Sequence, residues 1–112
     1  MNTALSYNRP SLHHKGVSTY QQNQILNLSA TELILKLYDL AIIAIKKKDV
    51  HKANRVITEL IGALNFDYQD VAIGFFRLYR FCQDRLYKGD FDQVLRIFED
   101  LRKTWAEAYN LT

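Results

Sequence analysis

The distribution of helix-breaking residues constrains this chain more than any other feature. The only proline among its 112 residues is Pro10, and the four glycines stand apart at positions 16, 62, 74 and 89. Proline in a helix interior removes a hydrogen bond and clashes with the preceding turn, so long helices form where it is absent. The chain beyond its N-terminal stretch therefore favours an all-α fold over a strand-and-turn fold.

Helix start signals mark the first two expected helices. Ser29 and Glu32 have the spacing of a capping box, and Leu28 and Leu33 have that of a hydrophobic staple. Asp49 is the expected N-cap of a second helix, because the apolar residues that follow it recur at helical spacing. The two helices are joined by a very short connection, so they are expected to run antiparallel.

Two further helices complete the expected domain. A break at residues 65–67 precedes a third periodic segment that ends at Gly89, and Asp90 opens a fourth. Residues 1–19 show no sustained period and are expected to form a flexible N-terminal tail. The prediction is an antiparallel up-down-up-down four-helix bundle over residues 20–112.

The first helix carries more apolar surface than a surface helix needs. On a helical wheel its apolar residues cover roughly 220°, and the polar wedge holds Glu32, Lys36 and Asp39. Three explanations fit: this helix is the most central one, a homodimer covers the surplus, or the surplus forms a groove for a partner. A groove between helices suits an amphipathic helix from another chain.

No constellation for catalysis or metal binding is recognisable. Cys82 lies within a helical pattern and is expected to be a buried thiol. His13 and His14 are adjacent in the tail and His51 begins the second helix, so no histidine has an apparent acid or metal-ligand set. The isolated glycines form no phosphate-binding loop. Neither an enzyme nor a cofactor is expected.

The charge balance is mildly basic and mixed. The chain has 15 Lys and Arg against 12 Asp and Glu, a net charge of +3, with both signs spread through its second half. Nucleic-acid-binding proteins usually show a basic stripe with few acids, so nucleic acid is not an expected partner. Because the chain lacks a long apolar run and the apolar stretch of a signal peptide, a cytoplasmic protein without membrane insertion is expected.

Several short motifs occur in a characteristic order from about residue 20 to the C-terminus. In that order they are Tyr20, Gln21, Asn23 and Gln24; Ser29, Glu32 and Leu33; Leu37, Tyr38 and Asp39; Lys48, Asp49 and Val50; Lys52, Ala53 and Asn54; Glu59 and Leu60; Leu64 and Asn65; Leu78 and Tyr79; Arg85 and Leu86; and Leu101, Arg102 and Trp105. This series resembles the flagellar secretion chaperone family FliS.

The resemblance implies a chaperone that binds the disordered C-terminal segment of flagellin in a hydrophobic groove. Such a chaperone prevents premature polymerisation and delivers its client to the flagellar export apparatus; other flagellar proteins are further candidate partners, and a monomer or weak homodimer is expected. Tyr20, Asn23 and Ile25 would contact the client or cover the empty groove. The candidate client-binding residues are Tyr20, Asn23, Ile25, Leu33, Ile34, Leu37, Tyr38, Ile42 and Phe76.

Two departures from the family pattern bear on the groove. Leu40 follows Leu-Tyr-Asp where the family has glycine, and residues 39–49 and 54–64 each lack about 7 residues, roughly two turns. A groove trimmed at one end of this hairpin is expected to rely more on contacts near Leu-Tyr-Asp. The alternative functions are a structural or regulatory bundle that homodimerises, and a sister flagellar chaperone with a different client.

Overall fold

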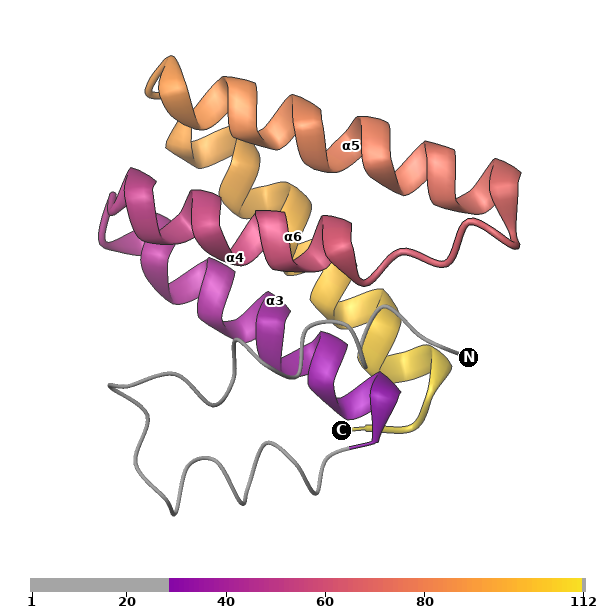
Figure 1. Cartoon of the computed structure of the whole chain (residues 1–112). Helices are drawn as coiled ribbons and strands as arrows, with labels where there is room; N and C mark the ends of the chain where they lie inside the picture. Colours follow the sequence, from indigo (N-terminus) through magenta and orange to yellow (C-terminus); the bar gives the residue numbers. More distant parts are fainter. Residues whose placement is uncertain (1–28, 112) are drawn as a thin grey trace, which may run out of the picture.

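The computed structural model describes residues 29–111, whose regular structure is entirely helical. The helices are α3 (Ala30–Lys46), α4 (Val50–Gly62), α5 (Gln69–Tyr87) and α6 (Phe91–Ala108). Both α3 and α5 pack against α4 and α6, so the four helices close a ring (Figure 1). The predicted four-helix bundle is confirmed; the predicted tail lies outside the described residues.

Three of the four helices begin with the predicted side-chain caps. Ser29 Oγ accepts a hydrogen bond from the Glu32 N–H at 3.2 Å, and Glu32 Oε1 accepts one from the Ser29 N–H at 3.0 Å. These bonds favour the carboxylate and hold the pKa of Glu32 below its ordinary value. Asp49 and Asp90 each accept a bond from the N–H three residues ahead, at 3.1 and 3.4 Å. The starts of α3, α4 and α6 are thus fixed locally.

The start of α5 is the exception. Tyr68 occupies its N-cap position and makes no side-chain capping bond. Instead, Asn65 Oδ1 accepts a hydrogen bond from the Asp67 N–H at 2.9 Å, which stabilises the turn between α4 and α5. The predicted break at residues 65–67 is confirmed, and α5 begins after this turn without a side-chain cap.

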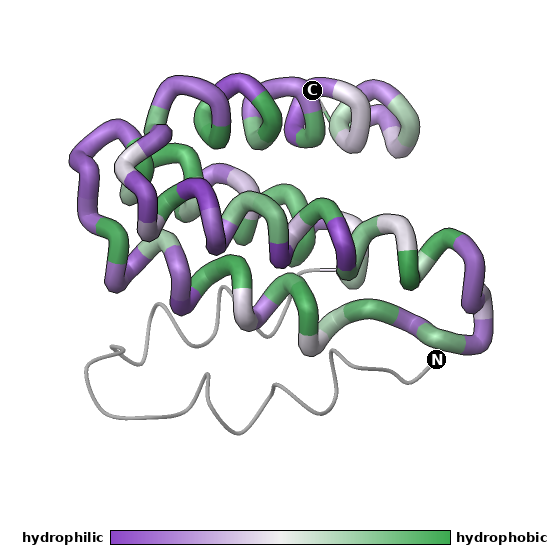
Figure 2. The backbone as a smooth tube through the Cα atoms, turned by 90° about the horizontal axis from the view of Figure 1, so that it is seen from above, coloured by the Kyte–Doolittle hydropathy of each residue, from purple (hydrophilic) through white to green (hydrophobic). Residues whose placement is uncertain are grey.

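The core contains one buried face from each helix. In Figure 2 the turns of α6 are green on the side toward the other helices and purple on the outer side. The packing has an aromatic centre, because the ring of Phe98 lies 5.9 Å from that of Tyr38 and 6.3 Å from that of Tyr79. The buried cluster consists of Tyr38, Ala41, Ala44 and Ile45 from α3; Ala53, Ile57 and Leu60 from α4; Tyr79, Cys82 and Leu86 from α5; and Val94 and Phe98 from α6.

Polar contacts fasten neighbouring helices across the bundle. Gln83 of α5 is buried and donates a hydrogen bond from Nε2 to Thr58 Oγ1 of α4 at 3.1 Å. Elsewhere in the bundle, Asp39 of α3 forms an ion pair with Arg102 of α6. Since buried polar groups are normally paired, the Gln83 bond helps to fix how α5 is placed against α4, while the Asp39–Arg102 pair joins α3 to α6 nearer the surface.

The thiol of Cys82 is fully buried, as predicted. Burial disfavours the thiolate and raises the pKa of Cys82 to about 12. Because the thiolate is the reactive form, this residue serves as a small apolar core residue.

Two glycines should respond oppositely to alanine. Gly74 is exposed within α5, and a Cβ added there has open space, so Gly74→Ala should stabilise the bundle by about 0.5–1 kcal/mol through helix propensity. Gly89 lies just beyond the C-cap of α5 with φ +80, where a Cβ is strained, so Gly89→Ala should destabilise the bundle by about 1–2 kcal/mol. Urea unfolding of both variants measures the difference; a loss of stability in Gly74→Ala would contradict this account of α5.

Candidate functional site

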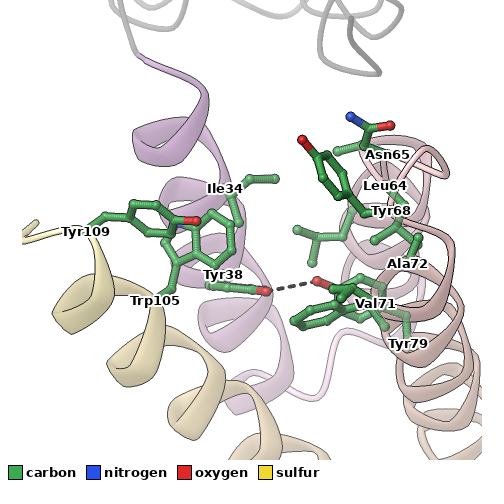
Figure 3. Close-up of a pocket in the computed structure, with 13 residues that line it drawn as sticks. Ile34, Tyr38, Leu64, Asn65, Tyr68, Val71, Ala72, Tyr79, Trp105 and Tyr109 are labelled. Atoms are coloured by element: carbon green, nitrogen blue, oxygen red, sulfur yellow. Dashed lines mark hydrogen bonds between the residues drawn. The ribbon is translucent and has the colours of Figure 1, made fainter. Parts of the chain in front are cut away.

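A cavity of about 530 Å³ opens at one end of the bundle. Its walls come from all four helices and from the connection between α4 and α5 (Figure 3). In an up-down-up-down bundle, the starts of α3 and α5 meet the ends of α4 and α6, which explains how residues distant in sequence gather there. The lining residues are Ile34 and Tyr38; Leu60, Ala63, Leu64 and Asn65; Tyr68, Val71, Ala72, Phe75 and Tyr79; and Trp105 and Tyr109.

The side of the cavity formed by α3 and α6 is held by a bond between these helices. Trp105 Nε1 of α6 donates a hydrogen bond to the backbone carbonyl of Thr31 at 2.8 Å. The indole ring also packs edge-on against Tyr38 and lies 4.8 Å from the ring of Tyr109. Trp105 therefore supports this wall both by packing and by hydrogen bonding.

Two tyrosines form the floor. The hydroxyls of Tyr38 and Tyr79 are joined by a hydrogen bond of 2.9 Å, which links α3 to α5 (Figure 3). The two residues are only 1% and 3% exposed. Burial is the main reason that the pKa of each phenol lies above its ordinary value. Both therefore remain protonated hydrogen-bond donors at any physiological pH.

The rim exposes apolar side chains to solvent. Val71, Tyr68 and Tyr109 are 62%, 71% and 49% exposed, although each is large and mainly apolar. None of the 13 lining residues carries a charged side chain. A contiguous apolar surface around a concave site is typical of surfaces that bind another molecule.

The predicted site residues lie at several places. Ile34 and Tyr38 line the cavity, with Tyr38 at its floor. Leu33 and Leu37 are half-buried on α3 and do not line it. Ile42 of α3 lines a second, more polar groove of about 470 Å³ between α3 and α6, and Phe76 of α5 is 38% exposed and lines neither the cavity nor this groove. The other three candidates, Tyr20, Asn23 and Ile25, lie outside the described residues.

Sequence reasoning missed the contribution of the other helices. Tyr68, Val71 and Phe75 lie at or near the start of α5, and Trp105 and Tyr109 lie at the end of α6, whereas the predicted groove was centred on α3. A usable signal was present, because an up-down-up-down arrangement brings the start of the third helix and the end of the fourth together. Aromatic residues are concentrated at both of these positions.

A sequence model of flagellar protein FliS matches residues 43–112. The chain belongs to the FliS family. FliS is a family of flagellar export chaperones rather than of enzymes, so this chain is assigned to flagellar export with flagellar proteins as its partners. The match begins within α3, after the Leu37-Tyr38-Asp39 motif. Comparisons with curated proteins and with solved structures give no match.

The motifs that resemble FliS contact one another in the bundle. Tyr38 bonds to Tyr79, Asp39 pairs with Arg102, and Trp105 bonds to the start of α3. They therefore hold α3 to α5 and α6, at the cavity through Tyr38, Tyr79 and Trp105 and at the second groove through Asp39 and Arg102. Over residues 29–111 no helix is long and apolar enough to cross a membrane, and no group of three potential metal ligands occurs.

Proposed function

We propose that the chain binds the disordered C-terminal segment of flagellin at this cavity in the cytoplasm. Bound there, the segment is kept from premature polymerisation and is delivered to the flagellar export apparatus. The observation that carries the proposal is the uncharged cavity with its exposed apolar rim in a member of the FliS family.

The dimensions of the cavity suit part of a helical client. A volume of about 530 Å³ accommodates a few side chains rather than a whole helix. An amphipathic helix would place its anchor side chains in the cavity and lie across Val71, Tyr68 and Tyr109 at the rim. A client that folds on binding loses conformational entropy, so it needs the apolar burial that this rim adds to the cavity.

The remaining candidate residues extend the proposed surface beyond the cavity. Leu33, Leu37 and Ile42 leave apolar surface on α3, and Phe76 does so on α5. A client that extends beyond the cavity would contact them outside the anchor site. We further propose that Tyr20, Asn23 and Ile25 compete with the client, which would lower its apparent affinity.

Calorimetry with the flagellin C-terminal segment tests the proposal. Micromolar binding with a negative heat-capacity change is expected, because apolar surface is buried. A peptide of the same composition in scrambled order is the control. Absence of binding in the micromolar range would reject flagellin as the client.

A structural role as a homodimer is the competing function, and an exposed apolar residue on α3 supports it. Ile43 is 49% exposed on α3 and lines the second groove together with Ile42. Analytical ultracentrifugation over a dilution series distinguishes the two proposals, because a dimer that persists on dilution, together with no peptide binding, would favour the structural role.

A further inference from the structure

The tyrosine pair on the cavity floor has one hydrogen-bond donor to spare. Each phenol carries a single O–H proton, and the bond between Tyr38 and Tyr79 uses only one of the two. Among residues 29–111, neither hydroxyl has any other hydrogen-bond partner. A buried donor without an acceptor is costly, so an acceptor supplied from outside the chain would be favoured at this point.

The cavity is the side from which an acceptor can approach. The rings of Phe98 and Trp105 pack against Tyr38, and those of Phe98 and Phe75 pack against Tyr79. Phe98 belongs to the buried core and does not line the cavity, whereas both tyrosines line it together with Trp105 and Phe75 (Figure 3).

The lining also restricts the charge of an occupant. Among the described residues that line the cavity, there is no cation to pair with a carboxylate and no carboxylate to pair with an ammonium group. An ion that enters such a site loses its hydration without gaining an opposite charge, which costs far more than moving a neutral polar group. A neutral acceptor is therefore preferred over a charged one.

We propose that the Tyr38–Tyr79 pair recognises one uncharged hydrogen-bond acceptor on the side chain that fills the cavity. The anchor residue of the client is then polar but neutral, with a side-chain amide or hydroxyl, and is flanked by apolar residues that meet the rim. This specificity rests on the proposed client-binding function, while the chemistry of the site can be tested without a client.

A purely structural role for the pair makes a different prediction. If the bond only fastens α3 to α5, its removal should affect all occupants of the cavity alike. If the pair recognises an acceptor, its removal should weaken only those occupants that carry one. Tyr38→Phe/Tyr79→Phe removes both hydroxyls together and leaves no orphaned partner, which makes the double variant the better probe.

Two small molecules of nearly the same shape separate these roles. Acetophenone has a neutral carbonyl acceptor and ethylbenzene has none; each is titrated into the full chain and followed by NMR shifts of the cavity residues. In Tyr38→Phe/Tyr79→Phe, acetophenone should bind about five- to tenfold more weakly and ethylbenzene within about twofold of its original affinity. Benzoate should bind the original protein more weakly than acetophenone.

The single variants provide a control that does not depend on the double variant folding. Tyr38→Phe and Tyr79→Phe each leave one hydroxyl whose proton is no longer used, so acetophenone should bind either variant within about threefold of its original affinity. Circular dichroism and urea unfolding verify that each variant is folded. Equal changes for acetophenone and ethylbenzene, or no shifts at the cavity with either, would overturn the proposal.

The small-molecule test of the tyrosine pair and the flagellin-binding test of the proposed function can fail independently. If acetophenone shows the expected selectivity but no flagellin segment binds, the site stands and flagellin is not its client. If the segment binds but the double variant loses no selectivity for acetophenone, the proposed function stands and the role of the tyrosine pair is rejected.

Discussion

Val71→Asp should abolish client binding while leaving the bundle folded. Val71 lies on the rim of the cavity and is 62% exposed, so a carboxylate there costs the free protein little. It is also the third residue of α5, where a negative charge is favoured by the helix dipole. A client that covers this position would bury the charge without a partner, and the affinity for the flagellin segment should fall by at least about 100-fold.

An aspartate introduced at the other end of α5 is the control. Tyr87 is 77% exposed, ends α5 and does not line the cavity. Tyr87→Asp therefore removes an exposed ring and adds a charge on the same helix without altering the proposed site. Calorimetry should show nearly unchanged affinity for this variant. Equal losses in both variants, or none in Val71→Asp, would place the client elsewhere.

Phe98→Ala should cause the largest loss of stability. Phe98 is completely buried and its ring packs against both floor tyrosines. Deleting a buried phenyl ring removes its transfer free energy and leaves a void, which typically costs about 3–5 kcal/mol. Since small domains are stable by only about 5–15 kcal/mol, a sizeable part of the fold's stability should be lost. Urea unfolding measures the change.

Phe76, a partly exposed phenylalanine on α5, provides the control for this result. Phe76 is 38% exposed and lies outside the core cluster, so Phe76→Ala should cost less than about 1.5 kcal/mol. If Phe98→Ala destabilised the bundle no more than Phe76→Ala, the aromatic centre would not be the main source of packing energy.

The fold was predictable because the signals that start and end its helices are local in sequence. Ser29, Asp49 and Asp90 each cap a helix through a bond to the backbone three residues ahead, and Gly89 adopts the positive φ expected where a helix ends. Such signals depend on a few neighbouring residues, so they can be recognised without knowing the tertiary structure.

The location of the cavity was less predictable because it depends on how helices pack. The apolar arc of α3 identified Ile34 and Tyr38, but that helix also packs on both α4 and α6, which uses much of the arc. Val71 and Tyr109 lie in segments 38 residues apart in the sequence (109 − 71) and meet only in the folded bundle. A wheel drawn for one helix cannot show that two helix ends share a site.

The burial of Tyr38 was likewise not predictable from the spacing of apolar residues. Its place on the apolar arc suggested a contact surface, whereas the structure gives it 1% exposure and a hydrogen bond to Tyr79. Only the partner on α5, 41 residues later, explains how a hydroxyl is accommodated in the core.

The entry and exit of the described chain beside the cavity have a practical consequence. α3 starts at this end, and Tyr109, which lines the cavity, is followed closely by Leu111. A peptide tethered at Ser29 or after Leu111 by a short flexible linker would experience an effective concentration on the order of millimolar near the mouth. Fusion at either point therefore offers a direct way to load the site with a chosen ligand of weak intrinsic affinity.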